Sequence, residues 1–85
     1  MRVMIPSALC SYTGAGEVEA EGATLAALLD DLDRRYPGIR FRVVDEQGRI
    51  RRHIRFFLNG EQSFDLGQSV GSGDELYIVQ ALSGG

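Results

Sequence analysis

One apolar stripe with the period of a helix limits what this chain can fold into. The stripe consists of Leu25, Leu28, Leu29, Leu32 and Tyr36. Its spacing of three and four residues predicts one amphipathic helix. Thr24 is the expected N-cap, and Pro37-Gly38 should end the helix because proline disfavours helical geometry in the residue before it. No other segment carries such a stripe, so we expect a single main helix.

The opposite face of this predicted helix is charged. Asp30 lies four residues before Arg34, and Asp31 lies four residues before Arg35. This spacing brings opposite charges together on a helix surface, so we expect two exposed ion pairs there.

Most of the remaining chain alternates with the two-residue period of strands. The predicted strands span residues 3–9, 17–21, 54–58, 61–66 and 75–80. Pro6 should lie at an edge or bulge of the first strand because proline has no N–H to donate to a neighbour. Asn59-Gly60 is a strong signal for a two-residue hairpin turn. In the last strand, Leu76 and Ile78 should face the core.

Two segments show no regular period. Residues 39–53 combine apolar side chains with the turn sequence Asp45-Glu46-Gln47-Gly48. We expect irregular structure or a short extra strand there. Residues 67–74 are rich in glycine and predict a connection to the last strand.

The order strand, strand, helix, strand, strand, strand predicts the α+β class. We expect a mixed sheet of four to five strands packed on one main helix. A helix between two hairpins, with the last strand paired beside the first, is the β-grasp (ubiquitin-like) arrangement. Residues 1–80 would form this domain, and residues 81–85 a flexible C-terminal tail.

The composition argues against several functional classes. The chain has one cysteine, Cys10, and one histidine, His53, so it can form neither an internal disulfide nor a zinc site with the usual number of ligands. We expect no bound metal or cofactor and a cytoplasmic location. No stretch is long and apolar enough for a signal peptide or a membrane span. Neither His53 nor Cys10 has an evident catalytic neighbour, so the chain alone is predicted not to be an enzyme.

The basic residues are unevenly distributed. All nine are arginine, and eight of them lie between residues 34 and 55. Such a patch raises the question of nucleic acid, but the net charge of −3 and the lack of a recognition motif argue against it. A solvated face or a docking surface for an acidic protein is the preferred interpretation.

The C-terminus is the remaining candidate for chemistry. Leu82, Ser83, Gly84 and Gly85 follow the last predicted strand with only Ala81 between them. Glycine has no Cβ, so two glycines can enter a channel too narrow for side chains and present the α-carboxylate of Gly85. Fully extended, residues 81–85 reach roughly 17 Å. The alternative is an ordinary frayed end.

Together, the predicted fold and the tail resemble the ubiquitin-like sulfur carriers of the ThiS and MoaD family. The matching segments are residues 3–6, 23–38, 57–61, 73–76 and 82–85. The order and spacing of these segments before a terminal Gly-Gly carry the resemblance. Within the family, the Ile5-Pro6 start, the Tyr12-Thr13-Gly14 turn and the arginine-rich insertion look most like the carriers that serve cysteine biosynthesis.

The resemblance implies a mechanism. An E1-like enzyme would use ATP to adenylate the carboxylate of Gly85, and sulfur would then replace the adenylate to give a thiocarboxylate. A second enzyme, similar to a cysteine synthase, would accept the sulfide. A C-terminal processing protease would be a further partner if the gene product extends beyond Gly85.

Three side chains are candidates for partner recognition. Phe57, Tyr77 and Val79 alternate out of phase with the predicted core residues, so they should lie on the open face of the sheet. Exposed apolar groups that gather on one face usually mark an interface. The alternative is that residues 39–53 fold back over them.

Other functions remain compatible with the sequence. The chain could be a ubiquitin-like modifier that is joined to other proteins through Gly85, or the small subunit of a molybdopterin-type or thiamin-type sulfur-inserting enzyme. It could also be a β-grasp binding module with an unreactive tail.

Overall fold

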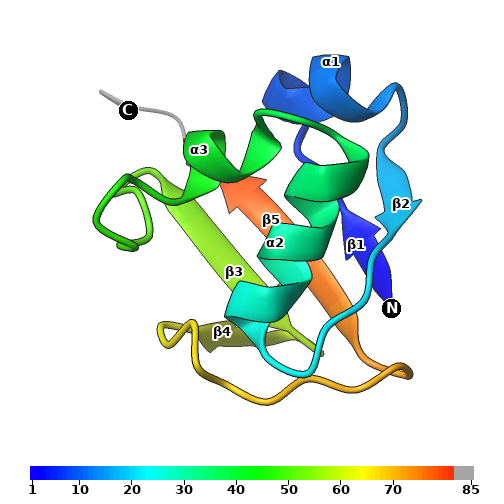
Figure 1. Cartoon of the computed structure of the whole chain (residues 1–85), viewed down its shortest axis with the longest axis vertical. Helices are drawn as coiled ribbons and strands as arrows, with labels where there is room; N and C mark the ends of the chain where they lie inside the picture. The colour runs from blue at the N-terminus through cyan, green and yellow to red at the C-terminus, as the bar shows by residue number, and fades with distance from the viewer. Residues whose placement is uncertain (82–85) are drawn as a thin grey trace.

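The structure, a computed structural model, describes residues 1–81 of the chain (Figure 1). The strands are β1 (Arg2–Met4), β2 (Glu17–Glu19), β3 (Ile54–Leu58), β4 (Glu61–Ser63) and β5 (Glu75–Gln80). The helices are the 3-10 turn η1 (Ser7–Leu9), α1 (Cys10–Thr13), α2 (Leu25–Arg35) and α3 (Ile39–Val43).

The five strands form one mixed sheet in the order β2-β1-β5-β3-β4. β1 and β5 are parallel, and the other three pairs are antiparallel. α2 and α3 both lie against one face of this sheet (Figure 1). The α+β class and the β-grasp arrangement, with the last strand beside the first, are therefore confirmed.

α2 follows the prediction closely. The Thr24 hydroxyl accepts a hydrogen bond from the Ala27 backbone N–H at 3.2 Å, as expected of an N-cap. Gly38 has a φ of 97°, which a residue with a Cβ rarely adopts, and it separates α2 from α3. The leucines of the apolar stripe are at most 1% exposed. They pack on the sheet residues Val3, Phe56 and Leu76, which are fully buried.

The hairpin between β3 and β4 is also confirmed. Asn59 and Gly60 both have positive φ, 52° and 86°, as a type I′ turn requires. The Asn59 side chain accepts a hydrogen bond from the Glu75 N–H at 3.0 Å and donates one to Asp74 at 2.9 Å. The turn is thereby fastened to the start of β5.

Three expected strands are shorter in the structure, and the second, predicted over residues 17–21, ends at Glu19. The first was predicted over residues 3–9 but ends at Met4, because Pro6 cannot continue the ladder and the chain turns into η1 and α1. The fourth was predicted over residues 61–66 but ends at Ser63. There the Asp65 carboxylate accepts the N–H of Gly67 at 2.8 Å and forms a turn.

The expectation for residues 39–53 was wrong in part. A short helix, α3, replaces the irregular structure or extra strand, because Ile39 and Val43 lie one helical turn apart and both bury their side chains against the core. The following turn is closed by an isolated antiparallel bridge between Val44 and Ile50.

The predicted ion pairs on α2 were correct for Asp31–Arg35 only. The Asp31 carboxylate pairs with both Arg34 and Arg35, and Asp30 pairs with Arg40 of α3 at 3.0 Å. Asp31 is 7% exposed because it also accepts the backbone N–H of Glu21 at 2.8 Å. This hydrogen bond, with help from the two arginines, lowers the pKa of Asp31.

Candidate functional site

The base of the predicted tail lies at the end of the central strand β5. Gln80 pairs with Ile54 of β3, and the backbone N–H of Ala81 donates to the His53 carbonyl at 2.7 Å. The ladder between β3 and β5 therefore continues one residue beyond β5. Ala81 is the last described residue, so Leu82, Ser83, Gly84 and Gly85 lie outside the described residues and the division between domain and tail stays a prediction.

The face of the sheet opposite α2 carries the three predicted recognition residues. Phe57 of β3 lies directly opposite Tyr77 of β5, which in turn neighbours Met4 of β1. Val79 follows two residues later, opposite Arg55 and toward the tail. These five side chains form a continuous surface across the three central strands, which we call the open face.

The open face is accessible in the described part of the chain. Tyr77 is 43% exposed and Val79 is 39% exposed, whereas Phe57 is half-buried. Residues 39–53 do not cover them, since Ile39, Val43 and Val44 instead belong to the core. The structure brings the three predicted residues together, and their role in partner binding stays a prediction.

The charges around the open face are unevenly placed. At the end far from the tail, Arg2 forms ion pairs with Glu17 at 3.0 Å and with Glu75 at 2.8 Å. The hydrogen bonds that Arg2 donates to Glu17, and the charges of Glu17 and Glu75, raise the pKa of Arg2. At the tail end, Arg55 stands beside Val79, and its guanidinium donates to the carbonyls of Arg52 and Ile54. A partner that docks here therefore meets an acidic end and a basic end.

Sequence reasoning missed two members of this surface. Arg55 could have been found from the alternation of β3, because it shares a face with Phe57. The place of Met4 depends on the register between β1 and β5, which the sequence pattern does not specify.

His53 and Cys10 lie outside this surface. His53 is half-buried just before β3 and contributes its backbone carbonyl to the tail base. Cys10 begins α1, and its Sγ lies 3.6 Å from the Pro6 carbonyl. Within residues 1–81, no group of three or more His, Cys, Asp or Glu side chains could hold a metal ion. None of the helices described is long and apolar enough to cross a membrane.

Comparisons with known proteins agree with this geometry. The family model described as "ThiS family" matches residues 3–85. The sulfur carrier protein CysO of Mycobacterium tuberculosis is 35% identical, over 98% of this chain and 96% of its own length. Small archaeal modifier protein 1 of Haloferax volcanii is 36% identical, over 80% of this chain and 78% of its own length.

The fold comparison points the same way. The crystal structure of the BexX/CysO complex of Amycolatopsis orientalis contains a chain that superposes on this one with a TM-score of 0.90 and 39% identity. The superposition covers 99% of this chain and 98% of the other. With nearly the whole sequence matched by the family model and the β-grasp fold in common, this chain belongs to the ThiS family.

Proposed function

We propose that this chain is a sulfur carrier that works through the α-carboxylate of Gly85. The observation that carries the proposal is that central strand β5 leads, through Ala81, into a sequence that ends in Gly-Gly, in a member of the ThiS family. The similarity to sulfur carrier protein CysO supports it. The carrier itself performs no catalysis and acts as a co-substrate in the cytoplasm.

The chemistry needs two steps, both performed by a partner enzyme. A carboxylate is a poor electrophile, so its oxygen first attacks the α-phosphorus of ATP, and pyrophosphate leaves. A sulfur nucleophile held by the partner then attacks the acyl carbon, the C–S bond forms, and AMP leaves with the electrons of the C–O bond. With sulfide (HS⁻) as the nucleophile, the loss of AMP leaves a thiocarboxylate on Gly85, and the sulfhydryl proton goes to solvent.

The thiocarboxylate then serves a second enzyme. Its sulfur is nucleophilic and stays covalently attached until the acceptor is in place, so free sulfide is not released into solution. The acceptor enzyme would resemble a cysteine synthase and make cysteine or another sulfur-containing metabolite. Beyond Ala81, four residues can span about 13 to 14 Å when extended, which is long enough to enter a buried active site.

The open face is the proposed docking surface for the adenylating enzyme. Tyr77 and Val79 precede the tail on the same strand, so a partner that covers them receives Gly85 at a limited distance. Aromatic residues in such a patch often contribute most of the binding free energy.

The test measures pyrophosphate release by the adenylating enzyme from the same genome as a function of carrier concentration. We expect Phe57→Ala to raise the apparent KM by about tenfold, as loss of an interface anchor does. Arg34→Gln is the matched control, because Arg34 is exposed on α2, on the other side of the sheet. An unchanged KM for Phe57→Ala would remove the open face from the docking surface.

A second candidate function is protein modification, which the similarity to small archaeal modifier protein 1 favours. In that case the activated Gly85 would acylate a lysine of another protein. This chain contains no lysine, so conjugates would not extend through its own side chains. Covalent adducts that survive reducing agent on denaturing gels, without a detectable thiocarboxylate, would favour the modifier.

A further inference from the structure

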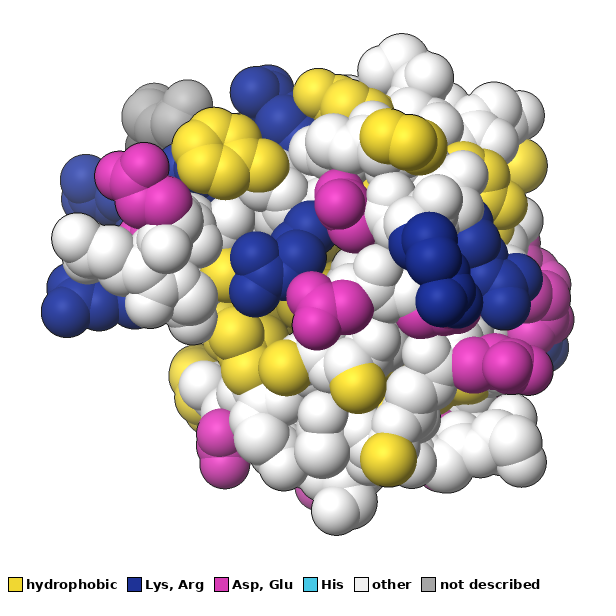
Figure 2. Space-filling view, in the orientation of Figure 1, with side chains coloured by type: hydrophobic (Ala, Val, Ile, Leu, Met, Phe, Trp, Pro, Cys, Tyr) yellow, Lys and Arg dark blue, Asp and Glu magenta, His cyan; other side chains and the backbone are white. Residues whose placement is uncertain are grey.

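A hollow of about 650 Å³ lies beside the outer strand β4 and shares only Arg55 with the open face. Its walls come from two segments on either side of the β3–β4 turn, within residues 48–56 and residues 62–66. Four arginines line it: Arg49, Arg51, Arg52 and Arg55. Figure 2 shows arginine side chains gathered at this edge of the molecule, over the loop between α3 and β3. We call this feature the arginine hollow.

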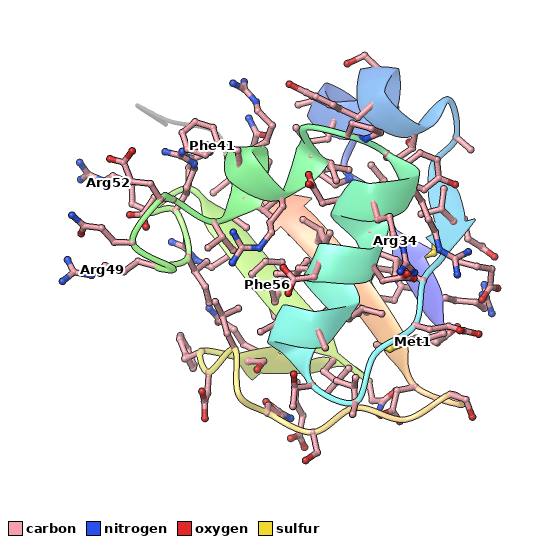
Figure 3. All side chains as sticks on the ribbon, viewed as in Figure 1. Met1, Arg34, Phe41, Arg49, Arg52 and Phe56 are labelled. Carbon is pink, nitrogen blue, oxygen red and sulfur yellow. The ribbon has the colours of Figure 1, made fainter. Side chains whose placement is uncertain are left out.

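Two of these arginines are held in place by the fold. The Arg51 Nε donates to the Phe41 carbonyl at 2.7 Å, and its guanidinium lies 4.6 Å from the centre of the Phe41 ring. Arg55 donates to the carbonyls of Arg52 and Ile54 at 2.6 and 3.0 Å. The side chains of Arg49 and Arg52 point away from the body of the molecule (Figure 3).

The positive charge of the arginine hollow is only partly offset within residues 1–81, where the backbone N–H of Arg49, helped by the charges of Arg51 and Arg49, lowers the pKa of the nearby Asp45 carboxyl. No carboxylate of the described chain forms an ion pair with any of the four arginines. The one acid in the lining is Asp65, and its Oδ1 already accepts the Gly67 N–H at 2.8 Å. Nearby, Asp45 accepts the N–H groups of Gln47 and Arg49. Arg51 and Arg55 keep the guanidinium N–H groups that they do not use for backbone carbonyls, and the side chains of Arg49 and Arg52 donate none of the hydrogen bonds described, so all four can contribute donors to an external anion.

Apolar side chains lie beside the four arginines in the lining of the arginine hollow. Phe64, directly after β4, is 78% exposed, which is the largest exposure among the large apolar residues described. Leu66 and Ile50 are half-buried beside it in the lining. An exposed phenylalanine next to arginines is typical of the residues that dominate protein interfaces.

We propose that the arginine hollow binds an acidic segment of a partner protein, with one apolar side chain of that segment packed on Phe64 and its carboxylates on the guanidinium groups. Fork-like arginine donors suit carboxylates, which they can hold with two hydrogen bonds. A nucleic acid fits less well, because the chain carries a net charge of −3 and phosphate binding alone gives Phe64 no role.

The position of the arginine hollow indicates which partner it serves. Its lining includes Ile54 and Arg55, and Ile54 pairs with Gln80 just before the tail base. A protein bound there would lie close to the exit of the tail, so we assign the acidic segment to an enzyme that acts on Gly85. This assignment rests on the proposed function, whereas binding of an acidic segment does not.

The test uses fluorescence polarisation with a labelled peptide of alternating glutamate and leucine. A peptide with glutamine in place of glutamate is the charge control, and oligothymidylate tests nucleic acid. We expect the glutamate peptide to bind the wild-type protein and the double variant Arg49→Glu/Arg52→Glu to weaken binding at least tenfold. These two are chosen because their own side chains make none of the hydrogen bonds described, and the carbonyl of Arg52 that accepts from Arg55 is kept in the variant. Phe64→Ser should weaken binding by about tenfold.

The matched control is again Arg34→Gln, which should bind like wild type. Equal binding of the glutamate and glutamine peptides would overturn the proposal, as would an arginine double variant that behaves like Arg34→Gln. Tighter binding of oligothymidylate, unaffected by Phe64→Ser, would assign the site to nucleic acid instead. Gly85 takes no part in this assay, so a negative result here does not affect the sulfur-carrier proposal. In the same way, an unmodified Gly85 would not affect the proposal that the arginine hollow binds an acidic segment.

Discussion

Two neighbouring phenylalanines on β3 show how differently the two faces of the sheet are used. Phe56 is fully buried between the sheet and α2 (Figure 3), whereas Phe57, the next residue, is half-buried on the open face. The same backbone therefore presents one ring to the core and one toward solvent. The helix-covered face therefore holds the core, whereas side chains of the open face can be substituted with less effect on the fold.

The largest expected effect of this contrast is on stability. Phe56→Ala should lower the free energy of unfolding by about 3–5 kcal/mol, because it leaves a cavity among buried leucines. Phe57→Ala should cost about 1 kcal/mol or less, since its ring is only partly removed from water. Urea denaturation of the two variants measures both values. Equal losses would mean that the open face is also part of the core.

A smaller expected effect is the loss of stability in acid. It depends on Asp31 of α2, on the helix-covered side of the sheet. The pKa of Asp31 is lowered in the folded state by the Glu21 N–H and the neighbouring arginines, so its charged form favours folding. That contribution is present above the unfolded-state pKa of about 3.9 and is lost as the pH falls through the lower folded-state value.

Asp31→Asn should therefore reduce stability at neutral pH and make the remaining stability fall less steeply in acid. Part of the acid dependence will persist, because the pKa values of Asp45 and Asp74 are also lowered by hydrogen bonds to backbone and side-chain groups. Glu46→Gln, on an exposed turn, is the control. Thermal unfolding at several pH values measures how steeply the melting temperature falls with pH. The same dependence on pH for Asp31→Asn and wild type would contradict this account.

Much of the fold could be predicted from local signals. The period of α2, its Thr24 cap, the Asn59-Gly60 turn and the alternation of β5 each have a cause within a few residues of sequence. α3 was missed because five residues give little more than one turn, too few for a period to be recognised. The burial of Asp31 was missed because it depends on Glu21, ten residues away.

The functional surfaces were also predicted only in part. The alternation of residues 54–58 and 75–80 was enough to place Phe57, Tyr77 and Val79 on one face. The arginine hollow was not predicted although the β3–β4 hairpin was, because the position of Arg49 and Arg52 depends on the turn closed by the Val44–Ile50 bridge, in a segment with no regular period. Its arginines were visible in the sequence as a charged run, but their position beside Phe64 was not.

The most direct test of the account is the intact mass of the protein recovered from its native cells, together with a variant that lacks Gly84 and Gly85. The account predicts a mass increase equal to the exchange of one oxygen for one sulfur. This increase should map to the C-terminal peptide and be absent from the variant. An unmodified terminus in both proteins, in cells whose sulfur pathway is active, would contradict the role of Gly85 as a sulfur carrier.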